Sequence, residues 1–228
     1  MFSLTTQQRA FFEAFGFLLL RGLFRDDVSR LQEGFEEVFS REQPQPLDPK
    51  NRYHHAEDPR YAEQPRWIVP GFIDKSEKLS WIRDDERTVA IASGLLGDYV
   101  YAESDGNVFN CDVYWHLDAF GAAAQHQHVK LFFYLQRLRH EAGALRVIPG
   151  SHHRGPYTKA LRSRLTAEPK AVPEQIGVAT DEVPSFTLEV DPGDVVVSDF
   201  RTIHASFNGG AQRRLFTVNF RSSARETR

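Results

Sequence analysis

His116 and Asp118 stand two residues apart in the segment YWHLDAF, and this spacing is a first chemical signal in the chain. Side chains two apart on a β-strand point to the same side, so this imidazole and this carboxylate can bind one metal ion. An H-x-D pair alone is weak evidence, because polar pairs of this kind are common on protein surfaces. The hypothesis of a metal site therefore needs a third ligand.

His204 offers that third ligand, since it follows the apolar segment VDPGDVVVSDF, which begins with a Pro-Gly-Asp turn. A rigid strand holds a residue at its end in a defined place. Two histidines and one carboxylate on one face of an octahedral iron leave three positions, enough for a bidentate keto acid and dioxygen. The three residues together predict a non-haem iron site in an oxygenase.

An arginine suits the far carboxylate of such a keto acid, because its guanidinium forms two parallel hydrogen bonds. Arg213 begins the predicted strand RRLFTVNF. Alternation along this strand predicts an outer face towards covering helices (Phe216, Val218, Phe220) and an inner face towards a barrel (Arg213, Leu215, Thr217, Asn219). Arg213 is therefore the preferred anchor, and Arg214 remains the alternative.

The elements that position these residues fall into two groups along the chain. Helices are expected at about 5–14, 25–39 and 84–96, with a strand at 17–20. From residue 99 onward, β-branched and aromatic runs alternate with turn residues, as in YVYAES, VFNCDVYWHLD, HVKLFFYLQ and RLFTVNFR. This order predicts a mainly β fold with helices, namely a double-stranded β-helix (a jelly-roll or cupin-like barrel) with N-terminal helices packed on one sheet.

Composition limits the classes of function. The 228 residues are 41% hydrophobic and include 18 Phe, which is enough for one sizeable core and predicts a single domain over residues 1–228. A net charge of −3 favours neither nucleic acid nor a membrane surface as a partner. The single cysteine, Cys111, excludes an internal disulfide and fits a reducing compartment. No apolar run is long enough for a signal or a bilayer span, so a cytoplasmic protein of undetermined oligomeric state is expected.

An ordered set of motifs resembles the phytanoyl-CoA dioxygenase family, which includes ectoine hydroxylase. The motifs are YWHLD, then GALRVIPGSH at 143–152, then H-x-S at 204–206 followed by two arginines. The resemblance runs from the N-terminal helix to the last strand. It implies Fe(II) and 2-oxoglutarate as cofactors, and hydroxylation of a small organic substrate by O2 with release of succinate and CO2.

The resemblance also implies roles for individual residues. It carries over the same three metal ligands and places 2-oxoglutarate on Arg213, with Ser206 assisting and Asn107 contacting the keto acid. Lys130, in HVKLFFYL, has two interpretations. It either points inward to pair with a carboxylate of 2-oxoglutarate or substrate, or it is an ordinary lysine on an edge strand.

Three residues are candidates for substrate contacts: Trp67, Phe120 and His126. Aromatic residues are more often plain core, so the first two are hypotheses only. His126 and His128 also form an H-x-H pair that rivals the proposed metal site. The segment after them contains no Glu, which leaves this rival without its carboxylate.

Two other functions stay open. A cupin-type metalloenzyme that uses no keto acid is compatible with the H-x-x-x-N spacing of His204 and Asn208. A jelly-roll binding module with a vestigial site is the non-enzymatic alternative. His152 and His153, in the turn PGSHH, are expected to be structural, and residues 40–64 are expected to form a long loop. The sequence does not name the substrate.

Overall fold

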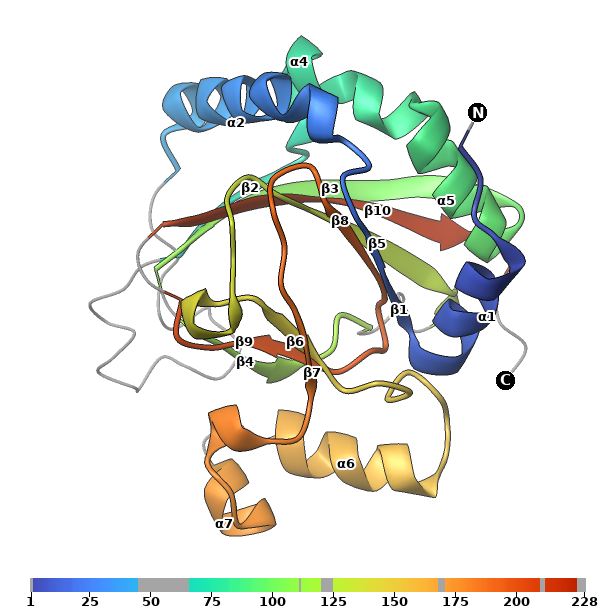
Figure 1. Cartoon of the computed structure of the whole chain (residues 1–228), viewed down its shortest axis with the longest axis vertical. Helices are drawn as coiled ribbons and strands as arrows, with labels where there is room; N and C mark the ends of the chain where they lie inside the picture. The colour runs from blue at the N-terminus through green and yellow to red at the C-terminus, as the bar shows by residue number, and fades with distance from the viewer. Residues whose placement is uncertain are drawn as a thin grey trace.

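Two antiparallel β-sheets face each other between layers of helices (Figure 1). The computed structural model describes residues 2–44, 66–110, 112–119, 125–167, 171–209 and 212–224. The six-stranded sheet has the spatial order β1 (Phe17–Leu20), β8 (Val195–Asp199), β5 (His128–Tyr134), β10 (Arg213–Ser222), β3 (Tyr99–Phe109), β2 (Arg66–Pro70). The four-stranded sheet has the order β4 (Val113–His116), β9 (His204–Ser206), β6 (Leu145–Val147), β7 (Phe186–Leu188). The predicted mainly β jelly-roll class is confirmed.

Helices cover the outer faces of both sheets (Figure 1). On the six-stranded sheet lie α2 (Val28–Glu42), α4 (Glu77–Ser80) and α5 (Glu86–Leu96), with α1 (Thr6–Phe15) beside β1. Beneath the four-stranded sheet lie α6 (Pro156–Thr166) and α7 (Val172–Ile176), which the sequence analysis did not predict. None of the helices within the described residues is long and apolar enough to cross a membrane.

The expected N-terminal elements form for the predicted local reasons. Thr5 caps α1 by accepting a hydrogen bond from the Gln8 amide, and Gly16 ends the helix in a left-handed conformation with φ 81°. The second helix begins at Val28, because Arg25–Asp27 forms a 3-10 turn instead. Asp85 caps α5 through the Arg87 amide. The expected loop at 40–64 lies mostly outside the described residues.

Two apolar cores lie on opposite faces of the six-stranded sheet. The helix-side core contains Phe35 of α2 and Ile91 of α5, and the core between the sheets contains Phe109 and Phe132. Strand β10 contributes to both. Its outer residues (Phe216, Val218, Phe220) join the helix-side core, and Leu215 joins the core between the sheets, as the alternation predicts.

Strand β3 corrects one expectation. The runs YVYAES and VFNCDVYWHLD are not separated by a turn at Asp105 and Gly106, because β3 continues from Tyr99 to Phe109. A Cβ at Gly106 would lie 2.2 Å from Cδ2 of Phe72, a ring that is fully buried on the helix side. This glycine therefore serves close packing within a strand rather than a turn.

Candidate metal centre

His116 and His204 lie directly opposite each other on the paired strands β4 and β9. Their ring centroids are 4.2 Å apart. His116 Nδ1 lies 2.8 Å from the Tyr114 carbonyl oxygen, and His204 Nδ1 lies 2.9 Å from the Thr202 carbonyl oxygen. An Nδ1–H that donates to a carbonyl leaves the lone pair on Nε2. Both imidazoles are thus set to bind a metal through Nε2.

Asp118 completes the group immediately after β4. Its backbone amide donates to the Phe200 carbonyl oxygen over 2.8 Å, which fixes the carboxylate beside the two rings. Its Oδ1 lies 4.0 Å from His116 Nε2, and its Oδ2 lies 3.7 Å from His204 Nε2. One potential ligand atom from each of the three residues lies within 4.8 Å of the others. Such a two-histidine, one-carboxylate set fits a divalent transition metal.

Burial sets the charge state of these residues. It lowers the pKa of His116 to about 3, with repulsion from His204 as the next cause, and it also lowers the pKa of His204. Burial alone would raise the pKa of Asp118, but the Lys130 ammonium and the two imidazoles outweigh that effect and hold it well below its usual range. At neutral pH the site therefore has neutral imidazoles and an ionised carboxylate, the forms that bind metals.

Lys130 points inward from the middle of the six-stranded sheet. Its strand, β5, is paired on both sides, with β8 and β10, so the interpretation as an edge-strand lysine is wrong. The Lys130 ammonium lies 3.1 Å from Asp118 Oδ2, and its side chain is 15% exposed. It forms an ion pair with the carboxylate of the candidate metal site.

Arg213 lies inside the barrel, and Arg214 lies outside it. Arg213 is 3% exposed, donates to the Gly143 carbonyl oxygen over 3.1 Å, and also donates to Ser206 Oγ. Ser206 Oγ in turn donates to the same carbonyl over 2.7 Å. Arg214 instead pairs with Glu36 of α2 on the surface. Of the two candidate anchors, the structure brings only Arg213 and its neighbour Ser206 to the interior.

Asn107 belongs to a polar group on the inner face of β3. Its Oδ1 accepts a hydrogen bond from Arg66 Nη2 over 3.1 Å, and its Nδ2 donates to Asp105. Asp105 also accepts a 2.7 Å hydrogen bond from Thr217 Oγ1 of β10. The sequence analysis missed Arg66 as part of this group, because the pairing of β2 with β3 is a long-range contact.

Tyr134 is a further residue that the sequence analysis missed. It shares the inner face of β5 with Lys130 and Phe132, and its ring stacks on Phe132 at 6.2 Å. Burial raises the pKa of Tyr134, and the positive charge of Arg213 acts in the opposite direction. A protonated phenol therefore lies near the buried guanidinium. Alternation along HVKLFFYL, counted from Lys130, would have indicated it.

Of the three expected substrate contacts, the structure describes Trp67 and His126. Trp67 is directly opposite Val108 and on the same face of β2 as Val69, which belongs to the helix-side core. It therefore faces away from the candidate metal ligands, which corrects that expectation. Phe120 lies outside the described residues. His126 Nδ1 lies 3.0 Å from the backbone carbonyl oxygens of residues 222 and 224.

The rival histidine pair does not form a metal site in the described part of the chain. The rings of His126 and His128 are 6.3 Å apart, and His128 stacks on Phe200. Among the described residues, the group that could hold a metal is the one formed by the other two histidines and the aspartate. His152 and His153 lie beside the end of α1, close to the carbonyl oxygens of Glu13 and Ala14, in agreement with a structural role.

Comparison with known proteins gives one family and a common fold. The family model described as phytanoyl-CoA dioxygenase (PhyH) matches residues 12–215. No curated protein sequence matches the chain.

Solved structures resemble the whole chain. SnoK, a non-haem alpha-ketoglutarate-dependent carbocyclase from nogalamycin biosynthesis, superposes with a TM-score of 0.71 at 19% identity, over 99% of this chain and 87% of its own. EctD from S. alaskensis, solved with 2-oxoglutarate and 5-hydroxyectoine, gives 0.68 at 20% identity over 96% and 76%. HygX from Streptomyces hygroscopicus, with nickel and 2-oxoglutarate bound, gives 0.68 at 17% identity over 97% and 88%. At these identities the likeness shows the fold.

Proposed function

Because the chain belongs to the phytanoyl-CoA dioxygenase family, we propose that it is a non-haem Fe(II)- and 2-oxoglutarate-dependent oxygenase. Its substrate is a small organic molecule, oxidised by O2 with release of succinate and CO2. The observation that carries the proposal is the group of His116, Asp118 and His204, whose potential ligand atoms lie within 4.8 Å of one another. Structural relatives that hold 2-oxoglutarate support the same cosubstrate.

His116, Asp118 and His204 would hold the iron, which supplies the oxidative chemistry when bound. Hydrogen bonds within the protein fix the orientation of these side chains before a metal binds. The carbonyl oxygens of Tyr114 and Thr202 keep each Nδ1 protonated and each Nε2 free. Lys130 holds one oxygen of Asp118 and so orients the carboxylate between the two rings. Little reorganisation is then needed when the metal binds.

Arg213 and Ser206 would bind the distal carboxylate of 2-oxoglutarate. Both side chains are buried and share the carbonyl oxygen of Gly143, so the guanidinium is already oriented. Tyr134 adds a neutral hydroxyl donor on the same inner face. Lys130 forms an ion pair with Asp118, so we assign it to the other end of the cosubstrate or to the substrate. Asn107 and Tyr134 both lie opposite Leu215 of β10, and we assign Asn107 to a contact with the keto acid.

The type of oxidation is a finer part of the proposal. Hydroxylation is our first choice, because the motif YWHLD is similar to that of ectoine hydroxylase. A fold match to a carbocyclase shows that this architecture also occurs in enzymes with other outcomes. The product of the first accepted substrate, identified by mass, separates the two, since hydroxylation adds one oxygen atom and ring closure adds none.

The test is anaerobic addition of Fe(II) and then 2-oxoglutarate, followed by visible absorption. Wild-type protein should develop the weak charge-transfer band of a bidentate keto-acid complex. His204→Ala should lose the band, because a metal ligand is gone, whereas His153→Ala, which removes an exposed histidine, should keep it. A folded wild-type protein without a band would contradict the proposal and favour a cupin-type enzyme without keto acid, or a binding module.

A further inference from the structure

The carbonyl oxygen of Gly143 orients the proposed anchor for 2-oxoglutarate. It accepts hydrogen bonds from Arg213 Nη1 over 3.1 Å and from Ser206 Oγ over 2.7 Å. Gly143 has φ +79°, and a Cβ there would lie 2.6 Å from Gly209 Cα and 2.7 Å from Arg213 Cδ. The backbone approaches the arginine too closely for any side chain. This carbonyl therefore fixes the guanidinium together with Ser206 Oγ.

Arg139 begins the turn that leads to Gly143. A short 3-10 turn, His140–Ala142, connects the two residues. The carbonyl oxygen of Arg139 closes this turn by accepting hydrogen bonds from the amides of Ala142 and Ala144, over 2.9 Å and 3.1 Å. His140, inside the turn, also donates its amide to Glu189 Oε1 over 3.1 Å and lies with Nδ1 3.0 Å from Thr187 Oγ1. Arg139 holds the beginning of the turn, and His140 holds its middle.

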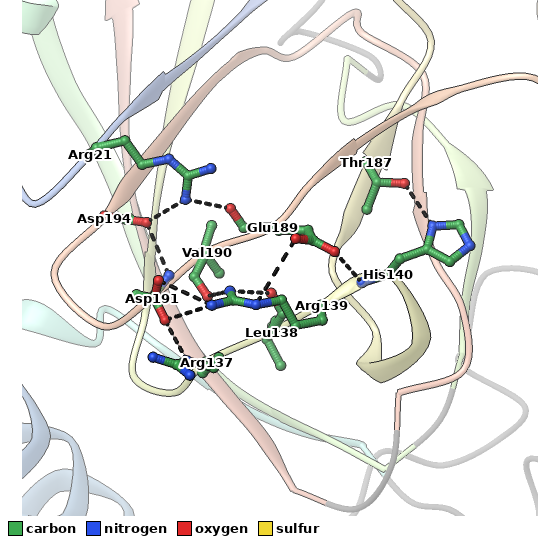
Figure 2. A network of polar contacts seen from close by, with 10 residues as sticks. All are labelled: Arg21, Arg137, Leu138, Arg139, His140, Thr187, Glu189, Val190, Asp191 and Asp194. Atoms are coloured by element: carbon green, nitrogen blue, oxygen red, sulfur yellow. Dashed lines mark hydrogen bonds and ion pairs between the residues drawn. The ribbon is translucent and has the colours of Figure 1, made fainter.

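The side chain of Arg139 fastens the turn to the segment before β8 (Figure 2). Its Nη1 donates to the Val190 carbonyl oxygen over 2.8 Å. Its Nη2 donates to both carboxylate oxygens of Asp191, over 3.0 Å and 3.2 Å. The backbones of Leu138 and Val190 exchange two further hydrogen bonds of 3.0 Å. These contacts define the clamp, namely Arg139 with residues 190 and 191.

The far side of the clamp is itself held in place. Asp194, whose side chain is 5% exposed, accepts from the Asp191 amide over 3.0 Å and from Arg21 Nη1 over 2.8 Å (Figure 2). Arg137 binds the same Asp191 carboxylate over 2.6 Å, but its side chain is 71% exposed and contacts no other polar group among the described residues. Arg137 thus pairs with the same carboxylate as Arg139 but does not bond the backbone of the segment before β8, which makes it a suitable control.

We propose that Arg139 is a positioning residue for 2-oxoglutarate, acting through Gly143 on Arg213 and Ser206. This inference rests on the proposed function of the arginine anchor. An exposed ion pair contributes little by itself. Arg139 differs because it is only 29% exposed and bonds a backbone carbonyl as well as two carboxylate oxygens. Its effect on binding comes from pre-organisation of the anchor, which reduces the entropy lost when the ligand binds.

The test measures two dissociation constants by calorimetry without turnover, first for Mn(II) and then for 2-oxoglutarate on the Mn(II)-loaded protein. Arg139→Gln should raise the Kd for 2-oxoglutarate by about tenfold, equivalent to about 1.4 kcal/mol, and leave the Kd for Mn(II) unchanged. Arg137→Gln is the matched control and should leave both constants unchanged. Arg139→Lys, which keeps the charge, should recover part of the affinity.

Asp191→Asn is a second test variant, because it weakens the clamp but leaves the hydrogen bond from Arg139 to the Val190 carbonyl in place. It should raise the Kd for 2-oxoglutarate by a smaller factor, and it replaces Arg139→Gln if that variant does not fold. Equal 2-oxoglutarate affinities in Arg139→Gln and Arg137→Gln would overturn the inference, as would a parallel loss of Mn(II) affinity. A wild-type protein that binds Mn(II) but no 2-oxoglutarate would overturn the proposed function instead, and the inference with it.

Discussion

At the scale of the residue, orientation decides the role of two identical neighbours. Arg213 and Arg214 are adjacent in the chain, yet one is 3% exposed beside Ser206 and the other pairs with Glu36 at the surface. The strand turns successive side chains to opposite faces, so residue type alone carries no information about which arginine reaches the interior.

Arg213→Gln should therefore weaken 2-oxoglutarate binding to the Mn(II)-loaded protein by at least about tenfold, since hydrogen bonds to charged groups contribute about 1.5–3 kcal/mol. Arg214→Gln is the control and should bind as wild type does. Calorimetric titration of the two variants checks the prediction. A larger loss in the Arg214 variant would show that the anchor had been assigned to the wrong arginine.

Local alternation explains which site residues could be predicted from sequence. His116 with Asp118, and Arg213 with its strand, depend on spacing within one segment. The structure brings the first two beside His204 and buries Arg213. Arg66 and the clamp residue Arg139 depend on contacts between distant segments, which no local pattern indicates. Trp67 was misjudged because its strand was not predicted, so its face could not be assigned.

At the scale of the element, strand β3 shows how a glycine can be misread. Glycine beside aspartate is a turn signal in sequence, and it lies between two runs that were expected as separate strands. Gly106 instead lies in mid-strand, where the fully buried ring of Phe72 leaves no room for a side chain. The reason is tertiary packing, which the local pattern does not contain.

Gly106→Ala should lower the free energy of unfolding by about 1–3 kcal/mol, the usual cost of overpacking a core. Gly94→Ala is a matched control in α5, where the new Cβ would meet Leu4 at 3.4 Å. That change should be neutral or slightly stabilising, because alanine favours a helix. Urea unfolding of both variants measures the difference. A Gly106 variant as stable as wild type would contradict the packing argument.

The free energy of unfolding should depend on pH through His152, which lies where the turn at 149–153 meets the end of α1. His152 lies with Nε2 3.0 Å from the Glu13 carbonyl oxygen, and its buried Nδ1 has no hydrogen-bond partner among the described residues. Burial lowers the pKa of His152 below its usual value near 6.5. The unfolded chain therefore binds a proton that the folded protein resists, and stability decreases as pH falls below that value.

His152→Gln keeps a donor for Glu13 but cannot titrate. Its free energy of unfolding should fall less steeply between pH 6.5 and 5 than that of wild type, with a difference of at most about 1.4 kcal/mol per pH unit. Urea unfolding across this range gives the slopes, and His140→Gln, at an exposed surface position, is the control. Identical slopes in wild type and His152→Gln would exclude this residue as the cause.

At the scale of the whole molecule, the candidate site joins the two sheets. The metal ligands belong to or follow strands of the four-stranded sheet, whereas Arg213 and Lys130 belong to the six-stranded sheet. A metal and 2-oxoglutarate bound together would therefore bridge both layers of the barrel and bind only its folded form.

Mn(II) and 2-oxoglutarate together should stabilise the protein more than either does alone. At a concentration one hundred times its Kd, a ligand that binds only the folded state adds about 2.7 kcal/mol to the free energy of unfolding. Unfolding measured with each ligand singly and with both checks this, and Asp118→Ala should lose the joint effect. Equal stabilisation by 2-oxoglutarate with and without Mn(II) would place the keto acid away from the metal.

The strand order of the six-stranded sheet could not be predicted from sequence, because it depends on pairing between distant segments. This strand order also has a consequence for folding during translation. Strand β10, the last strand in the part of the chain that the structure describes, lies between β5 and β3. Until the ribosome has released residues 213–222, the sheet exists only as two fragments, each with an unpaired edge. Such edges are the surfaces through which unfinished chains associate with one another. The complete sheet can therefore form only after residues 213–222 have left the ribosome.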